Sequence, residues 1–124
     1  MATNITITAG DVKLKAQLND SPTAVAIAAT LPLNGNGQRW GKEIYFEIPI
    51  TAELESDARD VLNPGELGYW PTGNAFCIFW GPTPASHTDE IRAASPVNII
   101  GKVNGDLSLF DHIESNTPVT IESA

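Results

Sequence analysis

The sequence predicts a mainly β protein, a small closed barrel of about eight mostly antiparallel strands with two short helices that plug the barrel ends. Several segments alternate apolar and polar residues with the period of a half-buried strand. Turns rich in proline, glycine and asparagine separate these segments, and only two short segments read as helices. At 124 residues, we expect one domain over residues 1–124.

The chain opens with a predicted hairpin, in which NITIT and VKLKAQL alternate apolar and polar residues on either side of a turn. A short helix follows, where Ser21 can cap the first turn and Pro22 suits the first helical position. Pro32 prevents this helix from continuing. Because the helix is apolar all round, we expect it to plug an opening in the sheet and to have no solvent face.

The middle of the chain contains one strand with two different faces. LNGNGQRWGK is predicted as a loop before this strand, because it lacks the lysine and hydroxyl residue of a phosphate-binding loop. In EIYFEIPI the expected core face holds Ile44, Phe46, Ile48 and Ile50. The expected solvent face holds Glu43, Tyr45, Glu47 and Pro49. TAELESDARDVLNPGELG is predicted to be irregular and to contain a turn at residues 63–65.

AFCIFWG differs from the other predicted strands, because both of its faces are apolar. Ala75, Cys77 and Phe79 point one way, and Phe76, Ile78 and Trp80 point the other way. A strand of this kind is either covered on both sides or lines a cleft. After a proline-rich loop we expect a strand in PVNIIGKV, a short helix in DLSLFDHIE and a last strand in PVTIES.

The net charge and the single cysteine restrict the partners. The formal net charge is −8 and the seven basic residues are scattered, so we expect no nucleic-acid partner. No apolar run approaches the roughly 20 residues of a membrane helix, and no signal peptide is evident, so we expect a cytoplasmic protein without membrane contact. Cys77 is alone, which excludes an internal disulfide, and no motif indicates a metal or a cofactor.

Three stretches carry a family resemblance: RWGKEIYFEIPI, GELGYWPTGNAFCIFWGPTP and AASPVNIIGKV. In this order and at these spacings they resemble the short bacterial and archaeal cyclophilin-like proteins, a family known mainly as a domain of unknown function. More widely, the chain is similar to the true cyclophilins, which are eight-stranded barrels with a helix at each end and a peptide-binding cleft on the barrel wall. The resemblance implies that the face carrying Cys77 is the cleft side and that the face carrying Trp80 is core.

The chain departs from the prolyl isomerases of this fold, which use an arginine beside a phenylalanine and a glutamine to stabilise the twisted amide. EIYFEIPI contains no arginine and no glutamine. The resemblance puts Cys77 where the proline-pocket phenylalanine would be and Val97 where a cleft histidine would be. No motif places Arg39 in the catalytic position, so we expect no useful prolyl isomerase activity.

The candidate ligand site is one side of the barrel wall, formed by Glu43, Tyr45, Glu47, Trp70, Ala75, Cys77 and Phe79. An apolar wall beside a few polar groups is the composition that ligand pockets favour. The two glutamates share a strand face, where they either do acid and base work, accept an amide or amine, or are merely solvated. Trp40, Tyr69 and Trp70 either line a pocket or cap the barrel rim.

The leading functional hypothesis is a binding module that holds a small molecule or a peptide segment in a barrel-wall cleft. A divergent prolyl isomerase is one alternative. An enzyme or subunit of amide or carbamoyl metabolism is another, by analogy with the cyclophilin-like modules of urea amidolyase-type enzymes. Cys77 is expected to be a buried apolar residue and not a nucleophile, because neither His87 nor His112 has a spacing that argues for pairing with it.

Overall fold

The computed structural model describes residues 2–124, which form nine strands, one α-helix and one 3₁₀-helix. The elements in chain order are β1 (Thr3–Ala9), β2 (Val12–Leu18), α1 (Pro22–Ala28), β3 (Leu33–Arg39), β4 (Glu43–Glu47), β5 (Arg59–Leu62), β6 (Glu66–Trp70), β7 (Ala75–Phe79), β8 (Ile91–Asn104), η1 (Leu107–His112) and β9 (Thr117–Ser123). Antiparallel pairing joins every pair of neighbouring strands.

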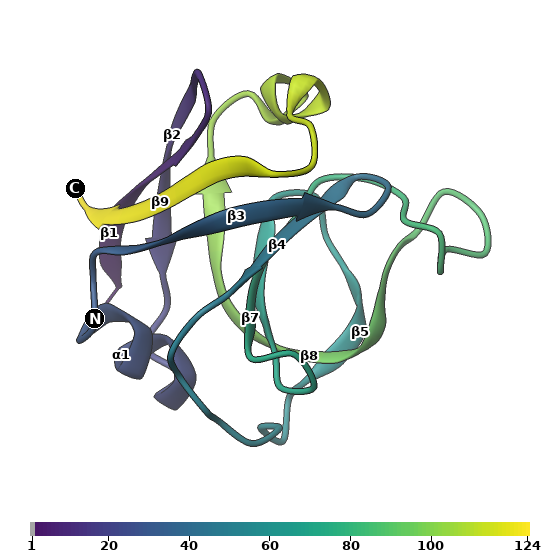
Figure 1. The fold of residues 1–124 in the computed structure, drawn as a ribbon. Coiled ribbons are helices and arrows are strands. Elements are labelled where there is room, and N and C mark those ends of the chain that lie inside the picture. The colour runs from purple at the N-terminus through teal and green to yellow at the C-terminus, as the bar shows by residue number, and fades with distance from the viewer. Residues whose placement is uncertain (1) are drawn as a thin grey trace.

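Eight of these strands form a closed ring, as the sequence predicted (Figure 1). The order around the ring is β2, β1, β9, β3, β4, β7, β6 and β8, and the pairing of β8 with β2 closes it. The ninth strand, β5, lies outside the ring and pairs only with the first half of β8. The fold is therefore mainly β, with a closed sheet and one additional strand on its outer side.

The main core fills the interior of the ring and includes the inward residues of β4 and β7. Helix α1 contributes Ala24 and Ile27 to this core and η1 contributes Phe110, and Figure 1 shows the two helices at opposite ends of the molecule. Val25 is 54% exposed, so α1 has a solvent face, contrary to the expectation from its composition. Neither helix within residues 2–124 has the length and apolar character needed to cross a membrane.

Helix capping follows the sequence prediction at the first helix. Ser21 is the N-cap of α1 and its hydroxyl accepts a hydrogen bond from the Ala24 N–H, while Pro22 occupies the first helical position. The second helix is a 3₁₀-helix and not an α-helix, with Asp106 as its N-cap. The hairpin of β1 and β2, the turn before β6 and the last strand lie where the sequence predicted them.

The glycine-rich segment predicted as a loop is in fact strand β3. Its glycines face the ring interior, where neighbouring side chains occupy the space that a Cβ would need. A Cβ at Gly37 would lie 2.7 Å from the Ile44 side chain and 2.8 Å from that of Val119. Gly35 has the same relation to Phe46, at 2.9 Å. Close packing requires glycine at these positions, whereas residue propensity alone predicts a flexible segment there.

Two further boundaries differ from the expectation. The segment predicted as irregular contains β5, and β8 begins at Ile91 instead of Pro96. Both differences have one cause, since β5 and the first half of β8 pair with each other. The pairing is supported by Arg92 on β8, whose guanidinium donates a hydrogen bond to the Asp60 carboxylate on β5 at 2.8 Å.

The extra strand pair covers the outer face of the sheet and creates a second, smaller core there. This second core contains Leu62, Ala75, Cys77, Phe79, Ile91, Ala93 and Val97. Strand β7 is thus covered on both sides, because Phe76 and Ile78 belong to the main core. The candidate functional site lies at the margin of the second core.

Candidate functional site

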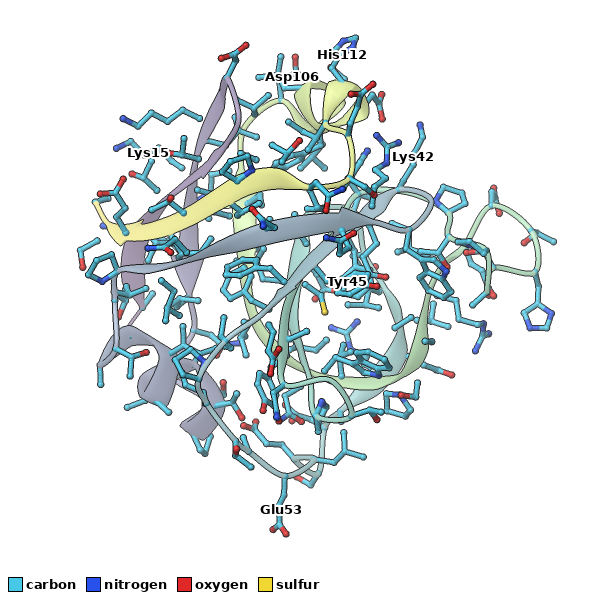
Figure 2. All side chains as sticks on the ribbon, in the orientation of Figure 1. Lys15, Lys42, Tyr45, Glu53, Asp106 and His112 are labelled. Carbon is cyan, nitrogen blue, oxygen red and sulfur yellow. The ribbon has the colours of Figure 1, made fainter. Side chains whose placement is uncertain are left out.

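A pocket of about 260 Å³ opens on the outer face of the sheet, beside the second core. Its lining residues come from the β3–β4 hairpin, the end of β6 and the first half of β8: Trp40, Glu43, Tyr45, Trp70, Ala93, Ala94 and Val97. Figure 2 shows Tyr45 in the space between β4, β7 and the curved strand β8. Among these residues, Glu43 is the only one that carries an ionisable carboxyl group.

The register of β4 and β7 brings the predicted site residues onto one face of the sheet. Glu43 lies opposite Phe79, Tyr45 opposite Cys77, and Glu47 opposite Ala75. Directly opposed residues of an antiparallel pair project to the same side. The apolar residues of β7 and the polar face of β4 therefore project to the same side of the sheet.

The individual residues of that surface have different positions. Glu43, Tyr45 and Trp70 line the pocket. Their three predicted partners on β7, Ala75, Cys77 and Phe79, are fully covered in the second core and lie outside the pocket lining. Glu47 is exposed and does not line the pocket. The ligand-binding role of this set stays a proposal.

A tight turn presents Trp40 and Glu43 on the same side. The Trp40 N–H donates to the Glu43 carbonyl at 2.9 Å and the Glu43 N–H donates to the Trp40 carbonyl at 3.2 Å. Gly41 has φ +64°, the left-handed conformation that two-residue hairpin turns require. A Cβ at Gly41 would lie 2.8 Å from the Thr83 Cα, so the turn is packed against the loop that follows β7. Backbone contacts thus fix the positions from which both side chains project.

The aromatic walls of the pocket are held in fixed orientations. The Tyr45 and Trp70 rings meet edge to face, with centroids 6.5 Å apart and an interplanar angle of 71°. The Trp70 indole N–H donates to the Ser95 hydroxyl at 2.6 Å. Gly73 passes so close to the same indole that a Cβ there would lie 2.8 Å from the ring. The Trp70 indole is therefore held by a hydrogen bond and by close packing against Gly73.

Glu43 is buried, although the sequence placed it on a wet face. Its residue is 5% exposed, because the strands and turn that surround the pocket cover it. Burial raises the pKa of Glu43 to about 7, and a hydrogen bond with the Cys77 thiol only partly offsets this rise. Within residues 2–124, none of the ion pairs involves Glu43. A carboxyl group with a labile proton and without a cation thus faces the pocket.

The nearest basic residue in the sequence does not neutralise this carboxyl group. The Lys42 ammonium lies 3.5 Å from the Asp111 carboxylate, and its stem packs over Gly81. Figure 2 shows Lys42 directed toward the end of the molecule that carries His112 and away from Tyr45. The positive charge of Lys42 is therefore paired with a carboxylate on η1.

Cys77 lies near Glu43 and is not arranged as a nucleophile. The thiol is 1% exposed, and burial together with the negative charge of Glu43 raises its pKa well above the ordinary value. Thiolate formation is therefore disfavoured, and the thiol donates its hydrogen bond to the Ala75 carbonyl, with the sulfur 3.7 Å from the oxygen. This environment agrees with the expectation of a buried apolar cysteine.

Two further aromatic residues and Arg39 differ in their positions relative to the pocket. Trp40 lines the pocket, whereas Tyr69 is fully buried in the main core and donates its hydroxyl proton to the Ile50 carbonyl at 2.6 Å. Arg39 lies opposite Ile44, on the inner face of the sheet. Its guanidinium donates to the Ile113 carbonyl and lies 5.1 Å from the centroid of the Trp80 ring. Arg39 is therefore turned away from the pocket.

Ala93 and Ala94 were not identified as site residues from the sequence. They lie in the part of β8 that was expected to be a loop, and alanine carries no chemical signal of its own. Val97 was considered only as the replacement for a cleft histidine. Pairing of β5 with β8 is what brings these residues over β4 and β7.

Comparison with known proteins agrees with the fold. The family model described as cyclophilin-like matches residues 3–122. The solution structure of a hypothetical protein from Archaeoglobus fulgidus is similar to this structure with a TM-score of 0.82 and 34% sequence identity. The similarity covers 98% of this chain and 95% of the other chain. No curated protein matches the sequence.

Proposed function

We propose that this chain, which belongs to the cyclophilin-like family, binds a small molecule or a peptide segment in the pocket over β4 and does not catalyse prolyl isomerisation. The observation that carries this proposal is the Glu43 carboxyl group, which is buried at the pocket without a basic partner. Burying an ionisable group is costly unless an interaction compensates for it. A ligand that pairs with Glu43 supplies that interaction.

The composition of the pocket supports binding. Six of the seven lining residues are aromatic or aliphatic, and Glu43 is the remaining one. Apolar walls with few polar groups are typical of ligand sites. The volume of about 260 Å³ lies slightly below the range of roughly 300 to 1,000 Å³ that drug-sized ligands occupy. The occupant is therefore a small molecule or a single side chain of a peptide.

The same residues argue against isomerase chemistry. Lowering the barrier requires a donor that stabilises the twisted amide more than the planar amide. The pocket lining contains no arginine, histidine, glutamine or asparagine, and the Trp70 N–H is already bonded to Ser95. Apolar walls bind both forms of the amide equally well. The alternative in amide or carbamoyl metabolism rests on fold analogy alone.

We also propose a domain organisation, a location and a restriction on partners, all of which rest on the sequence. We take residues 1–124 as one domain of a cytoplasmic protein with no nucleic-acid partner. The basic side chains support the last point, since Arg59 and Arg92 are paired with carboxylates and Arg39 with backbone carbonyls. Binding phosphates requires basic groups that are clustered and available.

A fragment screen read by amide chemical shifts tests the proposal. We expect fragments that bind to shift the amides of residues 40–45 and 93–97. Ala94→Trp fills the pocket from an exposed position and abolishes this binding, whereas Ala26→Trp, on the exposed face of α1, leaves it unchanged. Fragments that bind the Ala94→Trp variant as well as the wild type, or that shift only other amides, would refute the assignment.

A further inference from the structure

We propose that the pocket recognises a methylated ammonium group, with Glu43 as its counter-ion and Trp40, Tyr45 and Trp70 as its aromatic walls. This inference rests on the proposed function, because it names the ligand class of the same pocket. Two sources present such a group: a small quaternary amine and a methylated lysine side chain. Both place a large, weakly hydrated cation at the end of a short chain.

The charge of the pocket favours a cation. Glu43 is the only ionisable carboxyl group among the lining residues, and its side chain is almost completely buried. The nearby Lys42 is engaged with Asp111, so a cation that enters the pocket meets no competing positive charge from it. The chain as a whole carries a formal charge of −8, which attracts cations and repels anionic ligands.

The aromatic residues favour the same class of ligand. Trp40, Tyr45 and Trp70 make up three of the seven lining residues, whereas aromatic residues make up 7% of the chain. The faces of tryptophan and tyrosine rings attract cations, and aromatic cages are the usual way in which proteins bind quaternary ammonium groups. The ring planes of Tyr45 and Trp70 are inclined by 71° to each other, which is the arrangement of two adjacent walls of such a cage.

The supply of hydrogen-bond acceptors distinguishes a methylated ammonium from other cations. A primary ammonium has three N–H donors and a guanidinium has five. Among the lining side chains, only the Glu43 carboxylate and the Tyr45 hydroxyl accept hydrogen bonds, since an indole N–H only donates. Unpaired donors of a buried ligand reduce its affinity. Methyl groups remove those donors and pack instead against the rings, Ala93 and Ala94.

Dependence of binding on pH separates a cation from a neutral ligand. Glu43 titrates near pH 7, and the titratable groups beside it are the Cys77 thiol on β7 and the Tyr45 hydroxyl on its own strand. The lining residues of β6 and β8 carry no titratable group. A cation binds the carboxylate, so its affinity rises about tenfold between pH 6 and pH 8. A neutral ligand that accepts a hydrogen bond from the protonated Glu43 carboxyl group shows the opposite trend.

The experiment compares two isosteric probes by calorimetric or NMR titration at pH 8. Choline carries a trimethylammonium group, and 3,3-dimethylbutan-1-ol has the same shape without the charge. We expect choline to bind at least tenfold more tightly than the alcohol. Glu43→Gln is expected to weaken choline binding at least tenfold, and Trp40→Ala to weaken it severalfold through the loss of one aromatic wall. Glu47→Gln, on the same face but outside the pocket, is the matched control and leaves binding unchanged.

Each outcome decides the inference. Equal binding of the alcohol and choline, unaffected by Glu43→Gln, overturns the ligand class while the proposed binding function stands. Failure of choline and of every fragment to bind the pocket overturns both. A trimethyl-lysine peptide that binds more tightly than choline, with its unmethylated form as control, assigns the group to a protein side chain; the reverse order assigns it to a small molecule. Should Glu43→Gln fail to fold, Trp40→Ala together with the two-probe comparison still decides between these results.

Discussion

Glu43 and Glu47 show how much the environment of a residue determines its chemistry. They lie on the same face of one strand, four residues apart. Glu47 is exposed at the end of β4, whereas Glu43 is covered by the turn at residues 40–43 and by the first half of β8. Glu43 combines burial, a pKa raised to about 7 and a position in a pocket. The Glu43 carboxyl group can therefore bind or release a proton near neutral pH.

The raised pKa of Glu43 predicts a pH-dependent cost to stability. Its pKa is about 7 in the folded protein and 4.5 ordinarily, so the folded state holds the proton more tightly. This contribution is fully present below pH 4.5 and is lost as the pH rises through 7. We therefore expect Glu43→Gln to be more stable than the wild type at pH 8, by on the order of 3 kcal/mol, and equally stable at pH 4.

Urea unfolding of both proteins at the two pH values measures this difference, with Glu47→Gln as the exposed control. A Glu43→Gln variant whose relative stability is the same at pH 4 and pH 8 would show that the carboxyl group is not buried as described.

At the scale of the element, β3 shows that a glycine-rich strand can be a packing requirement. Its glycines alternate with asparagines along the strand, so one face meets the core and the other meets solvent. The inner positions lie against Ile44, Phe46 and Val119, which occupy the space above them. The strand is therefore stabilised by its neighbours on β4 and β9 and not by its own propensity.

Substitution on the two faces of β3 is expected to have opposite effects. Gly37→Val forces a side chain into space already filled by Ile44 and Val119, at a cost of about 1 to 3 kcal/mol. Asn36→Val adds the same side chain to the exposed face, where a β-branched residue is neutral or stabilising. Denaturant midpoints of the two variants provide the comparison. Similar tolerance at both positions would mean that the inner face is not closely packed.

At the scale of the whole molecule, the ring and its outer layer have separate tasks. The interior of the ring is a continuous apolar core closed by α1 at one end and by η1 at the other. The outer layer of β5 and the first half of β8 covers β7 and leaves a pocket at its margin. The main core and the pocket therefore lie on opposite faces of the same sheet.

The arrangement of the molecule also predicts the absence of prolyl isomerase activity. The uncatalysed barrier is roughly 18 to 20 kcal/mol, and a preorganised donor is needed to lower it. Arg39, the basic residue next to the β3–β4 turn, is bonded to the carbonyls of Asp111 and Ile113 on the inner side of the sheet. A protease-coupled assay on a short Xaa-Pro peptide is expected to show no acceleration at micromolar protein. Strong acceleration that is lost in Arg39→Ala would contradict this expectation.

Much of this architecture follows from local sequence patterns. Alternation of apolar and polar residues predicted β1, β2, β4 and β9, because one buried face imposes a period of two. Side-chain caps predicted the start of α1, and the residues from Asn63 to Gly65 predicted the turn before β6. The two apolar faces of β7 predicted a strand that is either covered on both sides or lines a cleft, and the structure buries both faces. These features depend on residues that are close together along the chain.

The tertiary structure alone decided which polar residue became the candidate site. Glu43 and Glu47 are equivalent in the sequence pattern, and only the pairing of β5 with β8 and the turn that begins at Trp40 bury one of them. The same pairing brings Ala93, Ala94 and Val97 over β4, although these residues are more than forty positions away along the chain. Local patterns report the side to which a residue points, whereas burial and pKa depend on what the rest of the chain places against it.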